Sequence, residues 1–163
     1  MGVKLKELCQ FLVKAKIQTY AGDGKRVEPE RSDFKELEFS EGEWCYRDSY
    51  TGFYRAPGQE VVRYKGKPIW IMSYSGGMKP KYHEKLKFSK QTYNFLKEAL
   101  KRVKVSSPFR GPESFKKGDY EYINKVEGNV KAFKGEEKIF YKGEEVFSQD
   151  YIGGLIVDEV KKS

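Results

Sequence analysis

One stretch of this sequence occurs twice. Residues 58–77 (GQEVVRYKGKPIWIMSYSGG) and 135–154 (GEEKIFYKGEEVFSQDYIGG) align without a gap at an offset of 77, sharing G-x-E, Y-K-G and Y-x-G-G. The motif FLVKA at 11–15 precedes the first copy, as FLKEA at 95–99 precedes the second. Glycine, tyrosine and lysine are abundant in this chain, so chance similarity is the alternative explanation. A duplication predicts two copies of one unit in the same order.

A predicted helix precedes each copy. In residues 3–18, apolar side chains recur at helical spacing and stop before the AGDG at 21–24. A second helix is predicted from about Lys90 to Lys104, with Ser89 as its N-cap. Elsewhere, short aromatic and β-branched runs are separated by glycine-containing turns, a pattern typical of antiparallel meanders.

These patterns predict an α+β fold. A helix followed by a curved meander leaves one face of its sheet bare, and a second such unit can cover it. We therefore expect two tandem pseudo-symmetric helix-plus-antiparallel-meander units, about 3–78 and about 88–157. Their two sheets should close around a shared interior and form a single domain, 1–163.

Length and composition suit one compact domain. With 163 residues and 38% hydrophobic content, the chain can fold without disulfides or a structural metal. No apolar run approaches the roughly 20 residues that cross a bilayer, and the first residues, MGVKLKEL, carry charges where a signal peptide is apolar. We therefore expect a cytoplasmic protein with no membrane partner. Lysine outnumbers arginine and glutamate outnumbers aspartate, which is the bias of thermophile proteins.

No motif names a reaction. His83 is the only histidine and lies among lysines, so a metal site or a catalytic triad has no second imidazole to use. Neither phosphate-binding glycine pattern occurs. We expect no metal, no cofactor and no catalytic residue, and the enzyme interpretation is the weakest of those considered below.

The net charge of +8 is concentrated in one segment. Residues 79–104 hold nine Lys or Arg against Glu84 and Glu98, whereas the rest of the chain is close to balance. On the second predicted helix four lysines share one face, opposite the apolar side: Lys90, Lys97, Lys101 and Lys104. Such a stripe attracts phosphates without regard to base sequence, which makes nucleic acid a possible partner. The alternative is an ordinary solvated helix face.

The stretch YRDSYTGFYRAPGQE, residues 46–60, crowds aromatic and charged residues together. In a strand, Tyr46, Asp48 and Tyr50 share one face. If that face lines a concavity, Asp48 is a polar group in an aromatic wall, as in small-molecule pockets. The alternative is a carboxylate that hydrogen-bonds the turn at Thr51 and Gly52.

Glu60 recurs as Glu137 in the second copy. In a pseudo-symmetric pair these carboxylates could converge near the axis, where two close acids share a proton or hold a metal. The alternative is that each is solvated or accepts backbone hydrogen bonds.

The middle of the chain resembles a family of small prokaryotic domains known as domain of unknown function 5680. The similar motifs are D-S-Y-x-G, G-x-E-x-V, G-x-P-x-W and Y-x-G, here Asp48, Ser49, Tyr50 and Gly52, Gly58, Glu60 and Val62, Gly66, Pro68 and Trp70, and Tyr74 and Gly76. The likeness runs from Leu8 to about Asp158. Some relatives are joined to a helix-turn-helix segment, which implies a sensing or partner-binding role. This chain begins directly at the first helix of the domain, and that departure weakens the inference. The resemblance supplies no catalytic residues.

The sequence therefore predicts a non-enzymatic binding module that recognises a small molecule or a protein segment in an aromatic-lined concavity. The residues expected to line it are Asp48, Tyr50, Glu60, Trp70, Tyr74, Glu137 and Tyr151. A nonspecific nucleic-acid-binding protein that uses the lysine stripe is the first alternative. A carboxylate-dependent enzyme is the second, and it requires a buried pair of acids with raised proton affinity.

Overall fold

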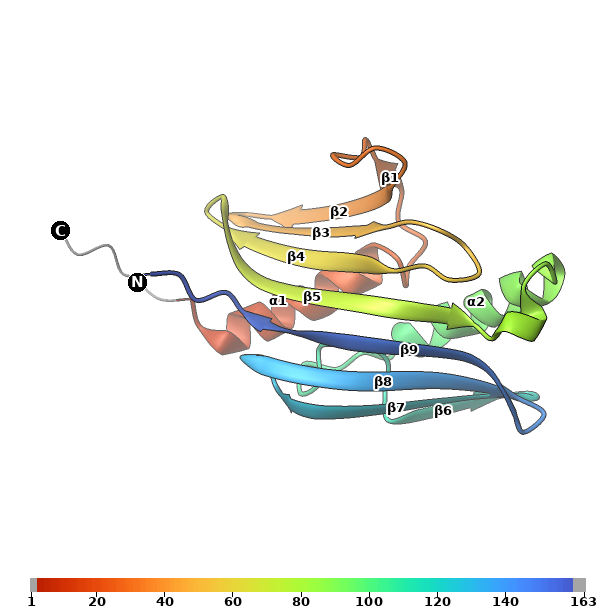
Figure 1. Ribbon diagram of the computed structural model, residues 1–163. Helices are drawn as coiled ribbons and strands as arrows, with labels where there is room; N and C mark the ends of the chain where they lie inside the picture. The colour runs from red at the N-terminus through yellow and green to blue at the C-terminus, as the bar shows by residue number, and fades with distance from the viewer. Residues whose placement is uncertain (1–2, 160–163) are drawn as a thin grey trace.

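A computed structural model describes residues 3–159, so the ends of the predicted domain 1–163 lie outside the described residues. Two helices, α1 (Leu5–Gln18) and α2 (Leu86–Leu100), cover one face of an antiparallel sheet (Figure 1). The strands are β1 (Arg26–Val27), β2 (Lys35–Glu41), β3 (Trp44–Tyr50), β4 (Gly58–Tyr64), β5 (Lys67–Met78), β6 (Ser114–Lys117), β7 (Tyr120–Asn129), β8 (Ala132–Tyr141) and β9 (Glu144–Leu155). The predicted α+β class is confirmed.

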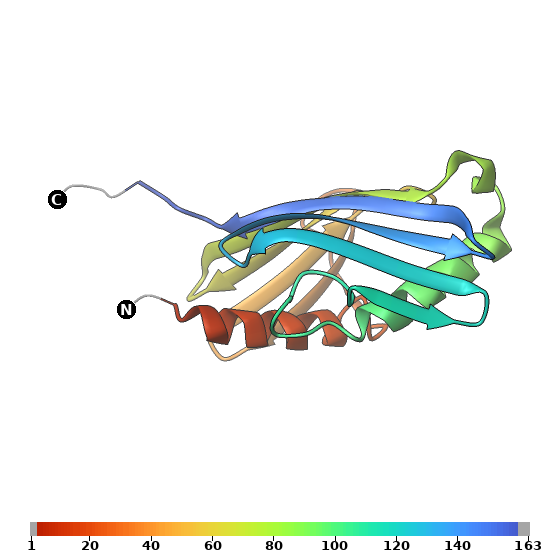
Figure 2. The ribbon, with the colours of Figure 1, turned by 90° about the horizontal axis from the view of Figure 1, so that it is seen from below.

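All nine strands belong to one sheet, in the order β1-β2-β3-β4-β5-β9-β8-β7-β6. Seen from below, this sheet curves over α1 and α2, which lie in line along its inner face (Figure 2). The expectation of two sheets closing on each other is wrong. The halves join edge to edge through β5 and β9, because pairing these long strands satisfies main-chain groups that would otherwise form two open edges.

The two halves show the same pairing pattern at an offset of 77. In β4–β5, Val62 faces Trp70 and the register shifts after Val62; in β8–β9, Ile139 faces Phe147 and the register shifts after Ile139. At the junction, Tyr74 is paired with Tyr151, its own counterpart at that offset. These matching registers agree with the predicted duplication of one unit, which stays a prediction.

The hairpin turns follow from the local sequence. Lys65-Gly66 and Lys142-Gly143 both adopt positive φ angles, of 52° and 77° and of 50° and 81°. Two such residues make a turn whose twist matches that of the flanking strands. The shared Y-K-G motif therefore fixes the hairpins β4–β5 and β8–β9.

The first helix is confirmed, whereas the bounds of the second are corrected. The helix α2 ends at Leu100, so Lys101 and Lys104 lie beyond it and the predicted four-lysine stripe is not one helix face. After Leu100 the chain tightens into a turn, in which Val103 N donates to Leu100 O at 3.1 Å and Val103 is buried. Ser89 is not the N-cap, since it lies buried inside the helix.

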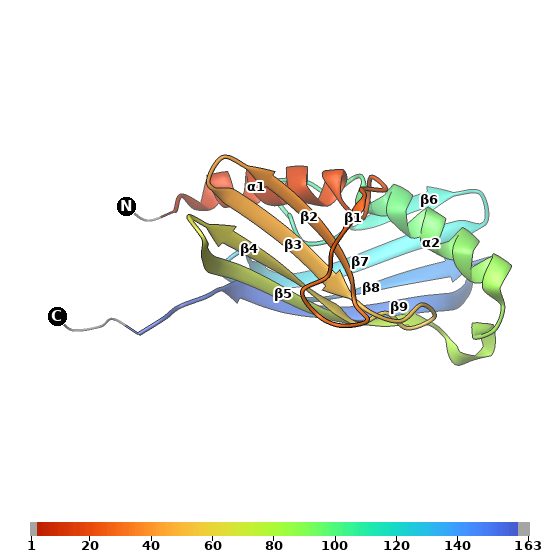
Figure 3. The same cartoon turned by 90° about the horizontal axis from the view of Figure 1, so that it is seen from above.

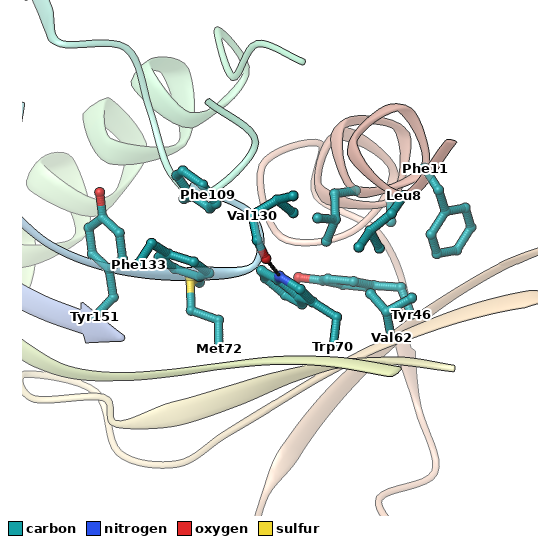
Figure 4. Close-up of a cluster of buried hydrophobic side chains, with 12 residues drawn as sticks. Leu8, Phe11, Tyr46, Val62, Trp70, Met72, Phe109, Val130, Phe133 and Tyr151 are labelled. Carbon is teal, nitrogen blue, oxygen red and sulfur yellow. Dashed lines mark hydrogen bonds between the residues drawn. The ribbon is translucent and has the colours of Figure 1, made fainter. Parts of the chain in front are cut away.

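The hydrophobic core forms two clusters, one beneath each helix. Under α1, the side chains of Leu8 and Leu12 pack on Tyr46, Val62 and Trp70 of the sheet (Figure 4). The Trp70 indole N–H donates to the Val130 carbonyl oxygen at 3.1 Å. Under α2, the members include Phe95, Leu96, Tyr122, Ile139 and Phe147. Within residues 3–159 neither helix is long and apolar enough to cross a membrane.

Two glycines permit the close approach of β5 and β9. A Cβ atom added at Gly76 would lie 2.2 Å from Ser148 O, and one added at Gly153 would lie 2.2 Å from Ile71 O. Both contacts are with backbone of the neighbouring strand, which cannot move aside without breaking the ladder. These glycines are therefore required by the junction between the halves.

We expect Gly76→Ala to lower the free energy of unfolding by about 3 kcal/mol, since the added methyl group overpacks the central strand pair. The control is Gly42→Ala, where φ is +59° and no atom lies within 4 Å. That change should cost only about 1 kcal/mol, the cost of the left-handed backbone. Urea denaturation measures both, and equal losses would contradict the packing role of Gly76.

Candidate functional site

A row of polar side chains crosses the inner face of the sheet. In the first half Asp48 on β3 is paired directly with Glu60 on β4. In the second half Asn124 on β7 is paired with Glu137 on β8, and Glu137 with Gln149 on β9. All five are buried. Burial of so many polar groups requires partners, since an unpaired charge away from water is costly.

Glu137 is saturated with hydrogen bonds. Arg110, from the loop between α2 and β6, donates through Nε and Nη2 to Glu137 Oε1 at 3.0 and 2.7 Å. Gln149 Nε2 donates to the same oxygen at 3.0 Å, and the Tyr122 hydroxyl donates to Oε2 at 2.6 Å. Such a network holds the Glu137 side chain in one orientation.

Glu60 and Glu137, which occupy matching positions in the two aligned segments, converge on Arg110. Its Nη1 lies 3.9 Å from Glu60 Oε1, while its other nitrogens bind Glu137. Glu60 also accepts a hydrogen bond from Lys16 Nζ, which reaches it from α1. A cation therefore lies between the two acids, and within residues 3–159 no cluster of His, Cys, Asp or Glu suited to a metal ion occurs.

Among residues 3–159, Asp48 has no ion-pair partner, unlike Glu60 and Glu137. Its Oδ1 accepts a hydrogen bond from the Tyr74 hydroxyl at 2.7 Å. Burial, and then the negative charge of Glu60 beside it, raise the pKa of Asp48 from 3.8 to about 7. By formal charge the cluster sets three acids, Asp48, Glu60 and Glu137, against the two cations Lys16 and Arg110.

Two small cavities flank this cluster. One, of about 40 Å³, is lined by Asp48, Tyr74, Arg110 and Gln149 together with Tyr20, Tyr50, Ala56, Gly76, Gly77, Tyr93, Leu96 and Phe147. The other, of about 20 Å³, includes Lys16, Glu60, Tyr20 and Arg110. Each is large enough for water and too small for a metabolite. We call the first the inner cavity.

An open cleft of about 270 Å³ adjoins the inner cavity. It lies where α2, the segment after α1 and the loop after β3 meet. Figure 3 shows α2 following α1 along the same face of the sheet. Four residues line both spaces: Tyr20, Tyr50, Ala56 and Tyr93. These four residues, the neck, separate the cleft from the buried acids.

A larger depression lies elsewhere. It has a volume of about 1060 Å³ and runs between the 104–114 loop and β7, lined in part by Cys9, Val105 and Val126. Of the buried polar cluster only Asn124 borders it. The cleft and inner cavity are the better candidate site, because the buried acid Asp48, whose pKa is raised, borders the inner cavity and groups with shifted pKa values cluster at functional sites.

The structure brings some of the predicted residues together and separates others. Asp48, Tyr50 and Tyr74 line the inner cavity, and Glu60 lines its smaller neighbour. Trp70 lies in the hydrophobic core and Glu137 is fully buried, so neither borders the inner cavity or the cleft. Tyr151 is likewise buried, and its hydroxyl donates to Asn124 Oδ1 at 2.7 Å.

Lys16 and Arg110 lie at the centre of the buried polar cluster, but they are not among the site residues predicted from the sequence. Lys16 lies one helical turn after Leu12, on the apolar face of the first helix, and this misplaced charge is the signal that points to it. Arg110 lies between Phe109 and Gly111 in a proline-flanked loop, and nothing in that pattern points inward.

An acid with a raised pKa binds a proton more tightly in the folded state, so Asp48 makes the protein less stable as pH rises from about 4 towards 7. Asp48→Asn keeps the acceptor for Tyr74 and removes this loss. The variant should exceed the wild type in free energy of unfolding by about 4 kcal/mol near pH 8 and equal it near pH 4. The control, Asp150→Asn, changes an exposed acid and should leave the pH curve unaltered. Parallel wild-type and Asp48→Asn curves would contradict the assignment.

Arg110→Met leaves two buried carboxylates without their shared cation, and we expect it to cost about 4 kcal/mol of stability. Adding Glu137→Gln should recover part of that loss, because the uncompensated charge is then gone. Chemical denaturation of the two single variants and the double variant measures the coupling. Lys14→Met, which breaks an exposed pair with Glu41, should cost less than about 1 kcal/mol. If the stability losses of Arg110→Met and Glu137→Gln simply add in the double variant, Arg110 and Glu137 are not coupled and the ion pair between them is contradicted.

A comparison with protein-family models matches residues 48–156 to a domain of unknown function, DUF5680. The match is narrower than the likeness from Leu8 to Asp158, since it begins at Asp48 and omits α1 and β2. No curated protein and no solved structure matches the chain. The matched segment spans more than half of the chain and contains Asp48, Glu60, Arg110 and Glu137. The chain therefore belongs to the DUF5680 family.

Proposed function

We propose that the protein is a binding module that takes a small molecule into the cleft and across the neck towards the inner cavity. The observation that carries this proposal is the continuity of the two spaces, which share Tyr20, Tyr50, Ala56 and Tyr93. Tyrosines supply apolar area, and the buried end offers both donors and acceptors. Asp48, Tyr74, Arg110 and Gln149 are the groups that would orient a ligand.

The size of the site supports a small molecule over a protein segment. The cleft, at about 270 Å³, is close to the lower end of ligand pockets, and the inner cavity adds a narrow polar end. The predicted ligand residues Trp70, Glu137 and Tyr151 support the site from behind rather than line it.

A nonspecific nucleic-acid-binding function is less well supported. Of the four predicted lysines, Lys90 and Lys97 line the cleft, and Lys97 forms an ion pair with Asp23. Lys101 and Lys104 lie past the end of α2. Binding through these lysines should fall steeply with salt and be lost in Lys101→Glu/Lys104→Glu.

An enzymatic function has one specific observation in its favour. Asp48 and Glu60 are a buried pair of acids, and the pKa of Asp48, about 7, suits a general acid or base. Glu60, however, is bound to Lys16, and only Asp48 borders the inner cavity. A reaction would therefore depend on Asp48 acting alone, so we place catalysis below binding.

We also propose that the two halves descend from one duplicated unit. The repeated register shifts, the repeated hairpin turns and the pairing of Tyr74 with Tyr151 support this origin. In such a pair, one half can specialise for a ligand while the other keeps the framework.

Ala56→Trp tests the proposal, because an indole at the neck fills the passage and removes no side-chain hydrogen bond. Metabolites that raise the melting temperature of the wild type should fail to do so in this variant. Ala132→Trp, at an exposed position on β8, is the control and should respond as the wild type does. If ligands stabilise both variants equally, the site lies elsewhere.

A further inference from the structure

The cleft collects positive charge from three separate parts of the chain. Arg26 lies on β1, Lys35 on β2, and Lys90 and Lys97 on α2, yet all four line the same space. No Asp or Glu is among its lining residues. This concentration arises from the fold, since only Lys90 and Lys97 belong to the basic segment seen in the sequence.

Three of these cations lack a carboxylate partner. Within residues 3–159, Arg26, Lys35 and Lys90 form no ion pair, whereas Lys97 is paired with Asp23 at the rim. Many other surface lysines are paired, for example Lys14 with Glu41, Lys79 with Glu145 and Lys117 with Glu98. Burial, and then the nearby charge of Arg26, lower the pKa of Lys35, so the like charges are close enough to repel.

Aromatic rings form the walls between the cations. Tyr20 and Tyr50 meet edge to face with ring centroids 6.0 Å apart. Lys97 Nζ lies 5.2 Å from the Tyr20 centroid, and Lys35 Nζ lies 5.7 Å from that of Tyr50. Tyr93, on α2, completes the wall. The space thus combines flat apolar surfaces with unneutralised positive charge.

The polarity of the site runs in one direction. The cations of the cleft have no acid among them, whereas the inner cavity presents the Asp48 carboxyl group and the Gln149 amide beside Arg110, which is already bound to Glu137. An anionic group is therefore favoured in the cleft, where the positive charges are not neutralised by a lining acid. A hydroxyl or amino group, in contrast, can donate to Asp48 at the inner end.

We propose that the ligand is a small organic anion, with a phosphate or carboxylate held by Arg26, Lys35 and Lys90 and a flat body held by Tyr20, Tyr50 and Tyr93. This inference rests on the proposed binding function and names the chemical class of its ligand. The neutral polar end of this ligand points inward, to Asp48.

Matched anionic and neutral probes test the inference. Calorimetric titration compares AMP with adenosine and benzoate with benzyl alcohol, with inorganic phosphate as a bare anion. At least one organic anion should bind about tenfold or more tightly than its neutral partner, and its affinity should fall between about 50 and about 300 mM NaCl. Equal binding within both pairs, or no anion bound at about 10 mM, would overturn the inference.

Variants assign the binding to the cleft. Arg26→Gln/Lys35→Gln should weaken the anion about tenfold or more, whereas Lys101→Gln/Lys104→Gln, with the same charge change past the end of α2, should not. Thermal unfolding without ligand shows whether both variants are folded. An unchanged affinity in the first variant, or an equal loss in the second as expected for a phosphate-binding lysine surface, rejects the anion site.

The two proposals can fail separately. Neutral probes that bind the wild type, and not Ala56→Trp, would preserve the binding function while rejecting the anionic class. An anion that binds both Ala56→Trp and Arg26→Gln/Lys35→Gln as tightly as it binds the wild type would reject both proposals.

Discussion

The shared cation between two buried glutamates is the interaction on which the interior depends. Arg110 connects Glu137 of one half to Glu60 of the other. Lys16 on α1 also binds Glu60, which joins that helix to the cluster. Burying these charges is costly, and the arrangement is stable only because each carboxylate has several partners. In return the cluster fixes one position for the 101–113 loop and for α1 over the sheet. Apolar packing alone specifies such positions less sharply, since many apolar contacts are nearly equivalent.

The junction of β5 with β9 makes this convergence possible. Because the halves are paired edge to edge, their equivalent strands face the same side, and the polar rows of both halves point under the same two helices. Two separate sheets packed face to face would have placed the rows on opposing layers. The tyrosines at the junction, Tyr74 and Tyr151, then each reach back to a polar residue of their own half.

Local features of the structure are predictable from the sequence, and long-range features are not. Helical spacing predicts α1, and the Y-K-G turns predict the two hairpins, because both depend on neighbouring residues. The end of α2 is mispredicted because Val103 continues the apolar spacing, although the chain has already turned at Leu100. The pairing of β5 with β9 depends on hydrogen bonds between residues far apart in sequence. Arg110 is hidden for the same reason, since Glu137 lies 27 residues away.

The two halves differ at one informative position. The hydroxyl of Tyr74 meets an acid, Asp48, whereas the hydroxyl of Tyr151 meets an amide, Asn124, at the same distance of 2.7 Å. An amide does not ionise near neutrality, so the contact between Tyr151 and Asn124 keeps its charge where the contact between Tyr74 and Asp48 can change. Of these two contacts, the one that can gain or lose a proton borders the inner cavity, so a change in acidity acts where a ligand would enter.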